Sequence, residues 1–277
     1  MILGGIGFMI GTGGSALVSY TLGTGDKEKA NRYFSMMVYF TILAGILLTV
    51  LGIIFVRPIA ELFGADESMM DTCVLYGRIV IAFNAAFMLQ NIFQSFFVVA
   101  EKPRLGLIVT IAAGVTNMVL DALFVGVFKW GIVGAALATG ISQSIGGLLP
   151  LLYFALPNNS PLQLTRTGFE LAPLLKASSN GCSELMSNVA SSLIGIMYNY
   201  QLMRLGGENA VATYGVLMYI QFVFIAIFIG YSVGSAPIIG YHYGAGNFKE
   251  LQNMRRKSLK IMSISGVLMA ILGFTLA

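Results

Sequence analysis

Eight long apolar runs restrict the possible folds of this chain more than any other feature. A helix needs about 20 apolar residues to cross a bilayer. Backbone amides cannot stay unpaired in hydrocarbon, so such segments form either helices or a closed barrel, and uninterrupted rather than alternating apolar runs favour helices. The runs cover residues 1–23, 33–57, 72–99, 105–128, 131–156, 174–203, 210–243 and 258–277. We therefore predict an all-α integral membrane protein, a polytopic bundle of about eight transmembrane helices.

The charge content supports a membrane protein. Charged residues make up only 10% of the chain and hydrophobic residues 57%, whereas a soluble domain carries about 25% charged residues. The net charge is +4, and the basic residues lie in short loops, which argues against nucleic-acid binding. The expected surroundings are a lipid bilayer, without a nucleic-acid partner.

The basic residues are distributed unequally between the two sides of the predicted bundle. Basic residues concentrate in cytoplasmic loops of membrane proteins. The side reached after the first run therefore becomes the cytoplasmic side, and we expect a multi-pass protein of the plasma membrane. Twelve of the 16 Lys and Arg residues lie on that side: Lys27, Lys29, Arg32, Lys102, Arg104, Arg166, Lys176, Lys249, Arg255, Arg256, Lys257 and Lys260.

Residues 11–56 align without a gap onto residues 232–277. Eight of these 46 positions are identical, and five of the eight are glycines. The alignment pairs SYTLGTGD (19–26) with GYHYGAGN (240–247). Glycines have positional meaning for the backbone, so the match indicates a true internal repeat. The copies begin in the first and the seventh runs, and because this offset of six is even, the repeat units are parallel.

Parallel repeats are typical of secondary transporters, in which the substrate path lies between the two halves. We predict an amino-terminal lobe over 1–156, a cytoplasmic linker over 157–173 and a partial carboxyl-terminal lobe over 174–277. If both repeat units were complete, one further helix would precede the chain and three would follow it, which gives twelve helices. On this interpretation the chain is a fragment of a two-lobe transporter.

Asp121 is the strongest candidate for an ion site. An acid inside a membrane segment is costly and usually functional, and Asn117 lies one turn earlier on the same helix face. We predict that the pair binds a cation or a proton. The alternative is a structural aspartate that caps the end of a neighbouring helix.

Other polar side chains predict a cavity with few charges. Glu184, Asn188, Ser192 and Asn199 recur at helical spacing, and polar stripes in membrane helices face the bundle interior or a watery cavity. The alternatives are helix–helix contacts for the amides and, for Glu184, a solvated acid in the first helical turn. The predicted cavity residues are Asn84, Asn91, Gln94, Glu184, Asn188, Ser192, Asn199 and Gln221.

Signals for catalysis, metals and nucleotides are weak. His242 is the only histidine, so a two-histidine metal site cannot be built, and GTGGS near the start lacks the Lys-Ser/Thr ending of a phosphate loop. We expect no enzyme activity, no cofactor and no metal, and therefore transport driven by an ion gradient. Pro237 lies among glycines in the seventh run, where it predicts either a hinge for alternating access or a static kink.

Several motifs resemble those of the multidrug and toxic compound extrusion (MATE) family. They are Glu101, Asn117-x3-Asp121 with Phe124, Trp130-Gly131, Gly134-Ala135-Ala136, Ala138-Thr139, LGGENAVATYGV (205–216) and APIIGYHYGAGN (236–247). The resemblance implies two six-helix lobes, of which this chain would hold family helices two to eight and most of nine, without the first helix and the last three.

The same resemblance implies an antiporter that exports drugs or amphipathic, often cationic, compounds in exchange for Na+ or H+, with Asn117 and Asp121 in the cation or proton site. The expected partners are a small-molecule substrate and the coupling cation, and we expect a monomer. One alternative is a lipid-linked saccharide flippase, although such a cavity tends to be lined by arginines and no Lys or Arg lies in the middle of a run. A membrane-embedded enzyme and a non-functional truncated fragment are the others.

Overall fold

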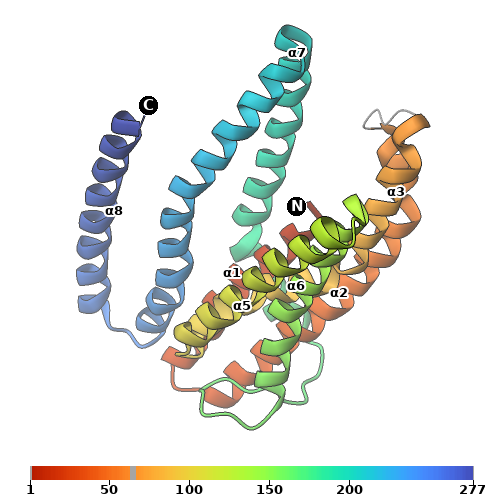
Figure 1. Cartoon of the computed structure of the whole chain (residues 1–277). Coiled ribbons are helices and arrows are strands. Elements are labelled where there is room, and N and C mark those ends of the chain that lie inside the picture. The colour runs from red at the N-terminus through yellow and green to blue at the C-terminus, as the bar shows by residue number, and fades with distance from the viewer. Residues whose placement is uncertain (1, 63–66, 277) are drawn as a thin grey trace.

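The computed structural model describes residues 2–62 and 67–276, and over these residues the chain folds into helices joined by short turns and one extended loop, 156–170 (Figure 1). The prediction of an all-α membrane protein is confirmed. The helices are α1 (Ile2–Gly23), α2 (Lys27–Leu62), α3 (Glu67–Ala82), α4 (Asn84–Val99), α5 (Pro103–Asp121), the π-helical segment η1 (Ala122–Val127), α6 (Gly131–Ala155), α7 (Leu171–Gly244) and α8 (Phe248–Leu276).

Within the described residues all eight apolar runs are helical, and one of them is divided differently from the prediction. The third run is divided into α3 and α4, and their spanning parts are bent by 46°. The sixth and seventh runs form the two halves of α7, which are separate helices joined by a sharp kink at Gly207 (φ 63°, ψ −158°), as the predicted boundary between 174–203 and 210–243 requires (Figure 1). Among the described residues, five helices are long and apolar enough to cross a membrane, or six if the bent pair is one span.

The helices form two groups that diverge from one end of the molecule. Figure 1 shows α1–α6 in one group, with α8 and the second half of α7 in an arm that stands apart from it at the end where the carboxyl terminus lies. The groups approach each other at the opposite end, where α1 and α7 both finish. In the first group an aromatic core joins α2, α4 and α6: the Phe34 ring lies 4.8 Å from that of Phe96 and 5.0 Å from that of Phe154. Close packing of this kind is what holds helices together in lipid, where apolar burial alone gives no driving force.

Glycines allow α1 to pack closely against both halves of α7. A Cβ atom added to Gly13 would collide with the backbone of Ala177 and Gly181, and one added to Gly181 would collide with the carbonyl of Met9. Small residues let membrane helices approach to backbone distance. This first crossing therefore depends on the absence of side chains at positions 13 and 181.

The second crossing lies where both helices end, and it is reciprocal. A Cβ atom added to Gly23 would collide with the carbonyl of Tyr241, and one added to Gly244 would collide with the carbonyl of Tyr20. These are counterparts in the repeat, 221 positions apart, so each copy makes the same contact on the other, as in a two-fold symmetric interface. The added Cβ of Gly240 would meet Ser19, which is its own counterpart, so the pseudo-two-fold axis passes beside this pair.

The turns after the two copies also match. Gly25 and Gly246 have positive φ angles of 89° and 68°, a conformation that glycine adopts without strain. Asp26 Oδ1 accepts a hydrogen bond of 3.0 Å from the backbone three residues later, and Asn247 Oδ1 accepts the equivalent bond at 3.2 Å. Each side chain thus caps the next helix. The internal repeat is present in the hydrogen bonds as well as in the residue types.

Candidate functional site

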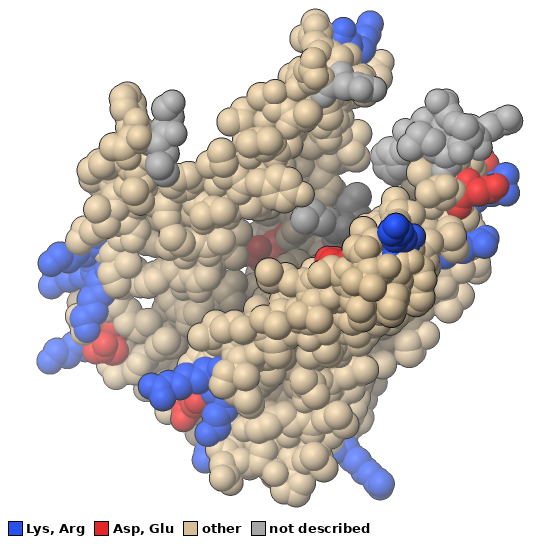
Figure 2. Space-filling model, in the orientation of Figure 1, with Lys and Arg blue, Asp and Glu red and all other residues tan. Residues whose placement is uncertain are grey.

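The space between the two helix groups is the candidate substrate path. Figure 2 shows it as a hollow that opens at the end away from the α1–α7 crossing, with walls formed mainly by uncharged side chains and a few acidic atoms. Lys and Arg side chains lie at the ends of the helices instead. A wide, sparsely charged opening of this kind suits amphipathic small molecules better than highly charged ones.

Asp121 lies at the end of α5, and the helix changes its hydrogen-bond pattern directly after it. The residue is about 27 Å along the helix axis from Pro103, midway between the middle and the end of the span Pro103–Val127. Segment η1 follows, in which Phe128 donates to the carbonyl of Leu123 at 2.9 Å, five residues back. Such π-helical insertions are frequent at functional sites.

The hydrogen bonds around Asp121 do not support the alternative of a structural cap. Asp121 is half-buried, and its Oδ1 is buried without a hydrogen-bond partner among the described residues. It makes no side-chain capping hydrogen bond to η1. A buried carboxylate oxygen without a partner is costly, and a bound cation or proton would remove that cost. Asn117, one turn earlier and also half-buried, is placed to supply an amide oxygen.

The three predicted amides of α4 do not share one environment. Asn84 and Asn91 are buried, and Asn84 Nδ2 donates to Met88 Sδ at 3.5 Å. Asn91 Nδ2 is buried without a partner in the described part of the chain. Gln94 is exposed and lines a small cavity against α5 and α6. Asn84 and Asn91 are seven residues apart and lie within about 20° of each other around the helix, because each residue turns by about 100°. Gln94, three residues after Asn91, is rotated from it by about 60°.

The predicted polar stripe on α7 forms a line of local hydrogen bonds. Asn188 Nδ2 donates to the Glu184 carbonyl at 2.8 Å, and Ser192 Oγ donates to the Asn188 carbonyl at 2.9 Å. Asn188 also lies beside Gly5 of α1. Glu184 and Asn199 are exposed. The stripe therefore runs from the α1 contact towards the open end of the molecule.

Gln221 lies apart from this stripe. It is exposed on the second half of α7 and lines a cavity of about 440 Å³ between the two halves of that helix. Tyr198 and Tyr214 line the same cavity, with their rings stacked at 5.3 Å. The structure thus places the eight predicted cavity residues in several environments rather than in one pocket.

Pro237 lies at the closed end of the molecule. It is buried and lines a cavity of about 540 Å³ between α1, the end of α4, α7 and the extended loop, together with Lys27 and Glu101. The residue of α7 with non-helical backbone angles is Gly207, not Pro237. This break lies between the two apolar runs predicted as separate helices, 174–203 and 210–243.

The sequence analysis also missed Thr41 and the π-helical segment. Thr41 is fully buried on α2, and its Oγ1 has no hydrogen-bond partner among the described residues. A threonine in an apolar run gives little signal, because such hydroxyls often bond to their own helix. Groups of three or more His, Cys, Asp or Glu that could hold a metal are not found in residues 2–62 and 67–276.

Comparison with known proteins matches this geometry to one family. The multidrug export protein MepA of Staphylococcus haemolyticus is 25% identical over 95% of this chain and 57% of its own length. The probable multidrug resistance protein YoeA of Bacillus subtilis is 29% identical over 95% of this chain and 58% of its own length. A solved transporter of the MOP superfamily from Pyrococcus furiosus superposes with a TM-score of 0.84 at 20% identity, over 94% of this chain and 58% of that one.

The chain thus spans less than two thirds of the length of these relatives. The model of the MatE family matches residues 1–123 and 185–277. These ranges include Asn117, Asp121 and both copies of the glycine turn. The chain belongs to the MatE family.

Proposed function

We propose that this chain is the transport-bearing part of a secondary active antiporter, which exports amphipathic, often cationic, compounds in exchange for Na+ or H+. The names of the relatives support multidrug export. The main structural support is the reciprocal contact of Gly23 with Tyr241 and of Gly244 with Tyr20, from which the two helix groups diverge around an open hollow.

The contact provides a pivot for alternating access. The basic end, which we place on the cytoplasmic side of the plasma membrane, is closed by the crossing of α1 and α7. Because the contact is related to itself by the pseudo-two-fold axis, the two groups can rock about it with little change in their own packing. Closure of the open end would then expose the hollow to the other side.

Asp121 would couple this motion to an ion gradient. In the open state its carboxylate would take up Na+ or H+ from outside, with the Asn117 amide as a second oxygen for Na+. Neutralisation lowers the cost of enclosing the carboxylate when the groups move together. Loss of the ion to the cytoplasm would restore the charge and favour reopening after substrate uptake.

The test is dye efflux from vesicles that contain the complete protein to which this chain belongs, under separate Na+ and pH gradients. The Asp121→Asn variant should show gradient-driven dye efflux that is at least tenfold slower, with an unchanged amount of protein in the membrane. The matched control is Glu28→Gln, which removes an exposed acid of the α2 first turn and should transport normally. Normal efflux by Asp121→Asn under both gradients would disprove the assignment.

A further inference from the structure

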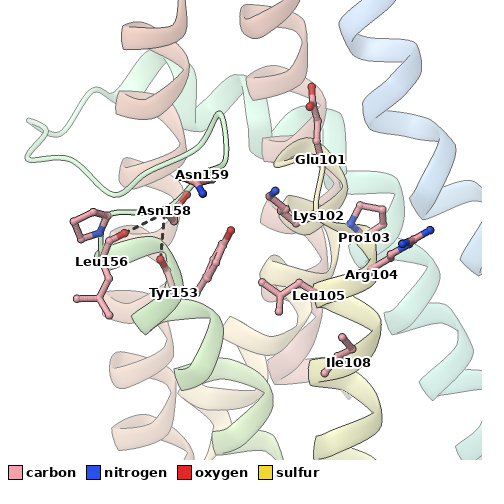
Figure 3. A pocket seen from close by; sticks show the side chains of 11 residues that line it. Glu101, Lys102, Pro103, Arg104, Leu105, Ile108, Tyr153, Leu156, Asn158 and Asn159 are labelled. Carbon is pink, nitrogen blue, oxygen red and sulfur yellow. Dashed lines mark hydrogen bonds between the residues drawn. The ribbon is translucent and has the colours of Figure 1, made fainter.

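A cavity with a charged lining lies outside the transport path, at the basic end of α5 and α6. It has a volume of about 810 Å³ and is formed by the start of α5, the end of α6 and the loop that follows α6. Figure 3 shows Lys102 and Leu105 directed across this space towards Tyr153 and Asn158, while Arg104 is turned away from them. None of these residues belongs to the candidate substrate path.

The polar part of the cavity favours a single negative charge. Lys102 is half-buried and ends inside the cavity, where the exposed Asn159 amide and the Tyr153 hydroxyl also lie. Glu101 also belongs to the lining, but it is exposed and its carboxylate points away from this space (Figure 3). Pro103 begins α5 beside it, so the positive end of the helix dipole adds to the field of the ammonium group.

The carbonyl end of α6, which would repel an anion, is covered. Asn158 Nδ2 donates to the carbonyls of Tyr153 and Leu156 at 3.2 and 3.1 Å. Its Oδ1 accepts from Ser160 Oγ at 2.6 Å. Asn158 is therefore occupied as a helix cap and screens the negative end of α6.

The apolar part of the cavity continues onto two exposed stripes. Leu105 and Ile108 of α5, and Leu156 directly after α6, line its floor. On α5 the exposed positions continue through Ile111 and Val115, and on α6 they continue back through Leu152. α5 and α6 pack against each other, so both stripes run from one end of the cavity into the depth of the bilayer.

We propose that this cavity binds an anionic glycerophospholipid from the membrane leaflet at the basic end of the helices. Its phosphodiester would lie against Lys102, Asn159 and Tyr153, and its acyl chains would lie along the stripes of α5 and α6. A free phosphate would share the polar contacts but would leave the apolar floor unused. Basic pockets between membrane helices on the cytoplasmic side are a recognised type of lipid headgroup site.

The experiment measures lipid retention. The 277-residue chain is incorporated into nanodiscs of phosphatidylcholine and phosphatidylglycerol, released into detergent, and examined by native mass spectrometry for bound lipid. We expect phosphatidylglycerol to be retained about fivefold over phosphatidylcholine, as follows from one basic group at the surface. Lys102→Gln should abolish most of this preference, and Lys102→Arg should keep it.

Two controls separate this site from general surface charge and from free anions. Arg104→Gln should have a smaller effect than Lys102→Gln, because Arg104 points away from the cavity. Lys249→Gln removes an exposed charge from the start of α8 and should change the preference by less than about twofold. Equal losses for Lys102→Gln and Lys249→Gln, or displacement of the lipid by millimolar inorganic phosphate, would overturn the proposal.

Discussion

The two copies of the internal repeat have the same turn but different packing upstream of it. In α1, Met9 and Gly13 lie against the backbone of Ala177 and Gly181. Their counterparts in α7 are Gly230 and Gly234, and a Cβ atom added to either would meet no other atom within 4 Å. The turns agree because they are set by local residues. The packing differs because it depends on which helix lies alongside.

The largest effect should come from filling the crossing that only the first copy makes. Gly13→Val should lower the free energy of unfolding by about 3 kcal/mol, because the side chain must displace the backbone of α7. Gly234→Val, its counterpart in the same chain, should change it by less than about 0.5 kcal/mol. Thermal unfolding of both variants in the same detergent measures the difference. Equal shifts would mean that the repeat copies pack alike after all.

A smaller effect, equal in the two copies, is expected at the reciprocal crossing. Gly23→Ala and Gly244→Ala should each cost about 1–2 kcal/mol, because each added methyl meets a carbonyl of the other copy. The double variant should cost less than the sum, since one separation of the helices relieves both collisions.

The matched control for this pair is Gly114→Ala, at an open position of α5. It should leave the unfolding temperature nearly unchanged. A markedly larger loss for one of the two variants than for the other would argue against the pseudo-two-fold relation.

The smallest effect concerns the helix caps, where the copies use different residues for the same bond. Asp26→Ala and Asn247→Ala should each cost about 1 kcal/mol. Exchange of the caps, as Asp26→Asn and Asn247→Asp, should be nearly neutral because both side chains are good caps. Unfolding measurements on the four variants test this. A clear loss of stability in Asp26→Asn or Asn247→Asp would show that the two turns differ in their surroundings as well as in their cap residues.

The candidate site was only partly predictable. Asp121 could be found because an acid in an apolar run is rare. The burial of its Oδ1 without a partner among the described residues, and the π-helical turn after it, depend on backbone geometry. Asn84 and Gln94 looked equivalent as amides in one run, yet one is buried in the bundle and the other is exposed. The proposed lipid cavity was not predicted at all, since Lys102 and Tyr153 are brought together by the antiparallel packing of α5 and α6.

The sequence by itself determined the helical fold, the number of apolar segments and the repeat spacing of 221 residues. These features follow from local causes: unpaired backbone groups in lipid, apolar run lengths, and glycines at positive φ. Only the tertiary structure decided that Gly23 and Gly244 lie against each other's copy, that the third apolar run is bent between α3 and α4, and that polar residues of similar type occupy different environments. Contacts between distant segments depend on how helices rotate and cross. Close backbone approaches at a few glycines fix this arrangement, and no single segment encodes it.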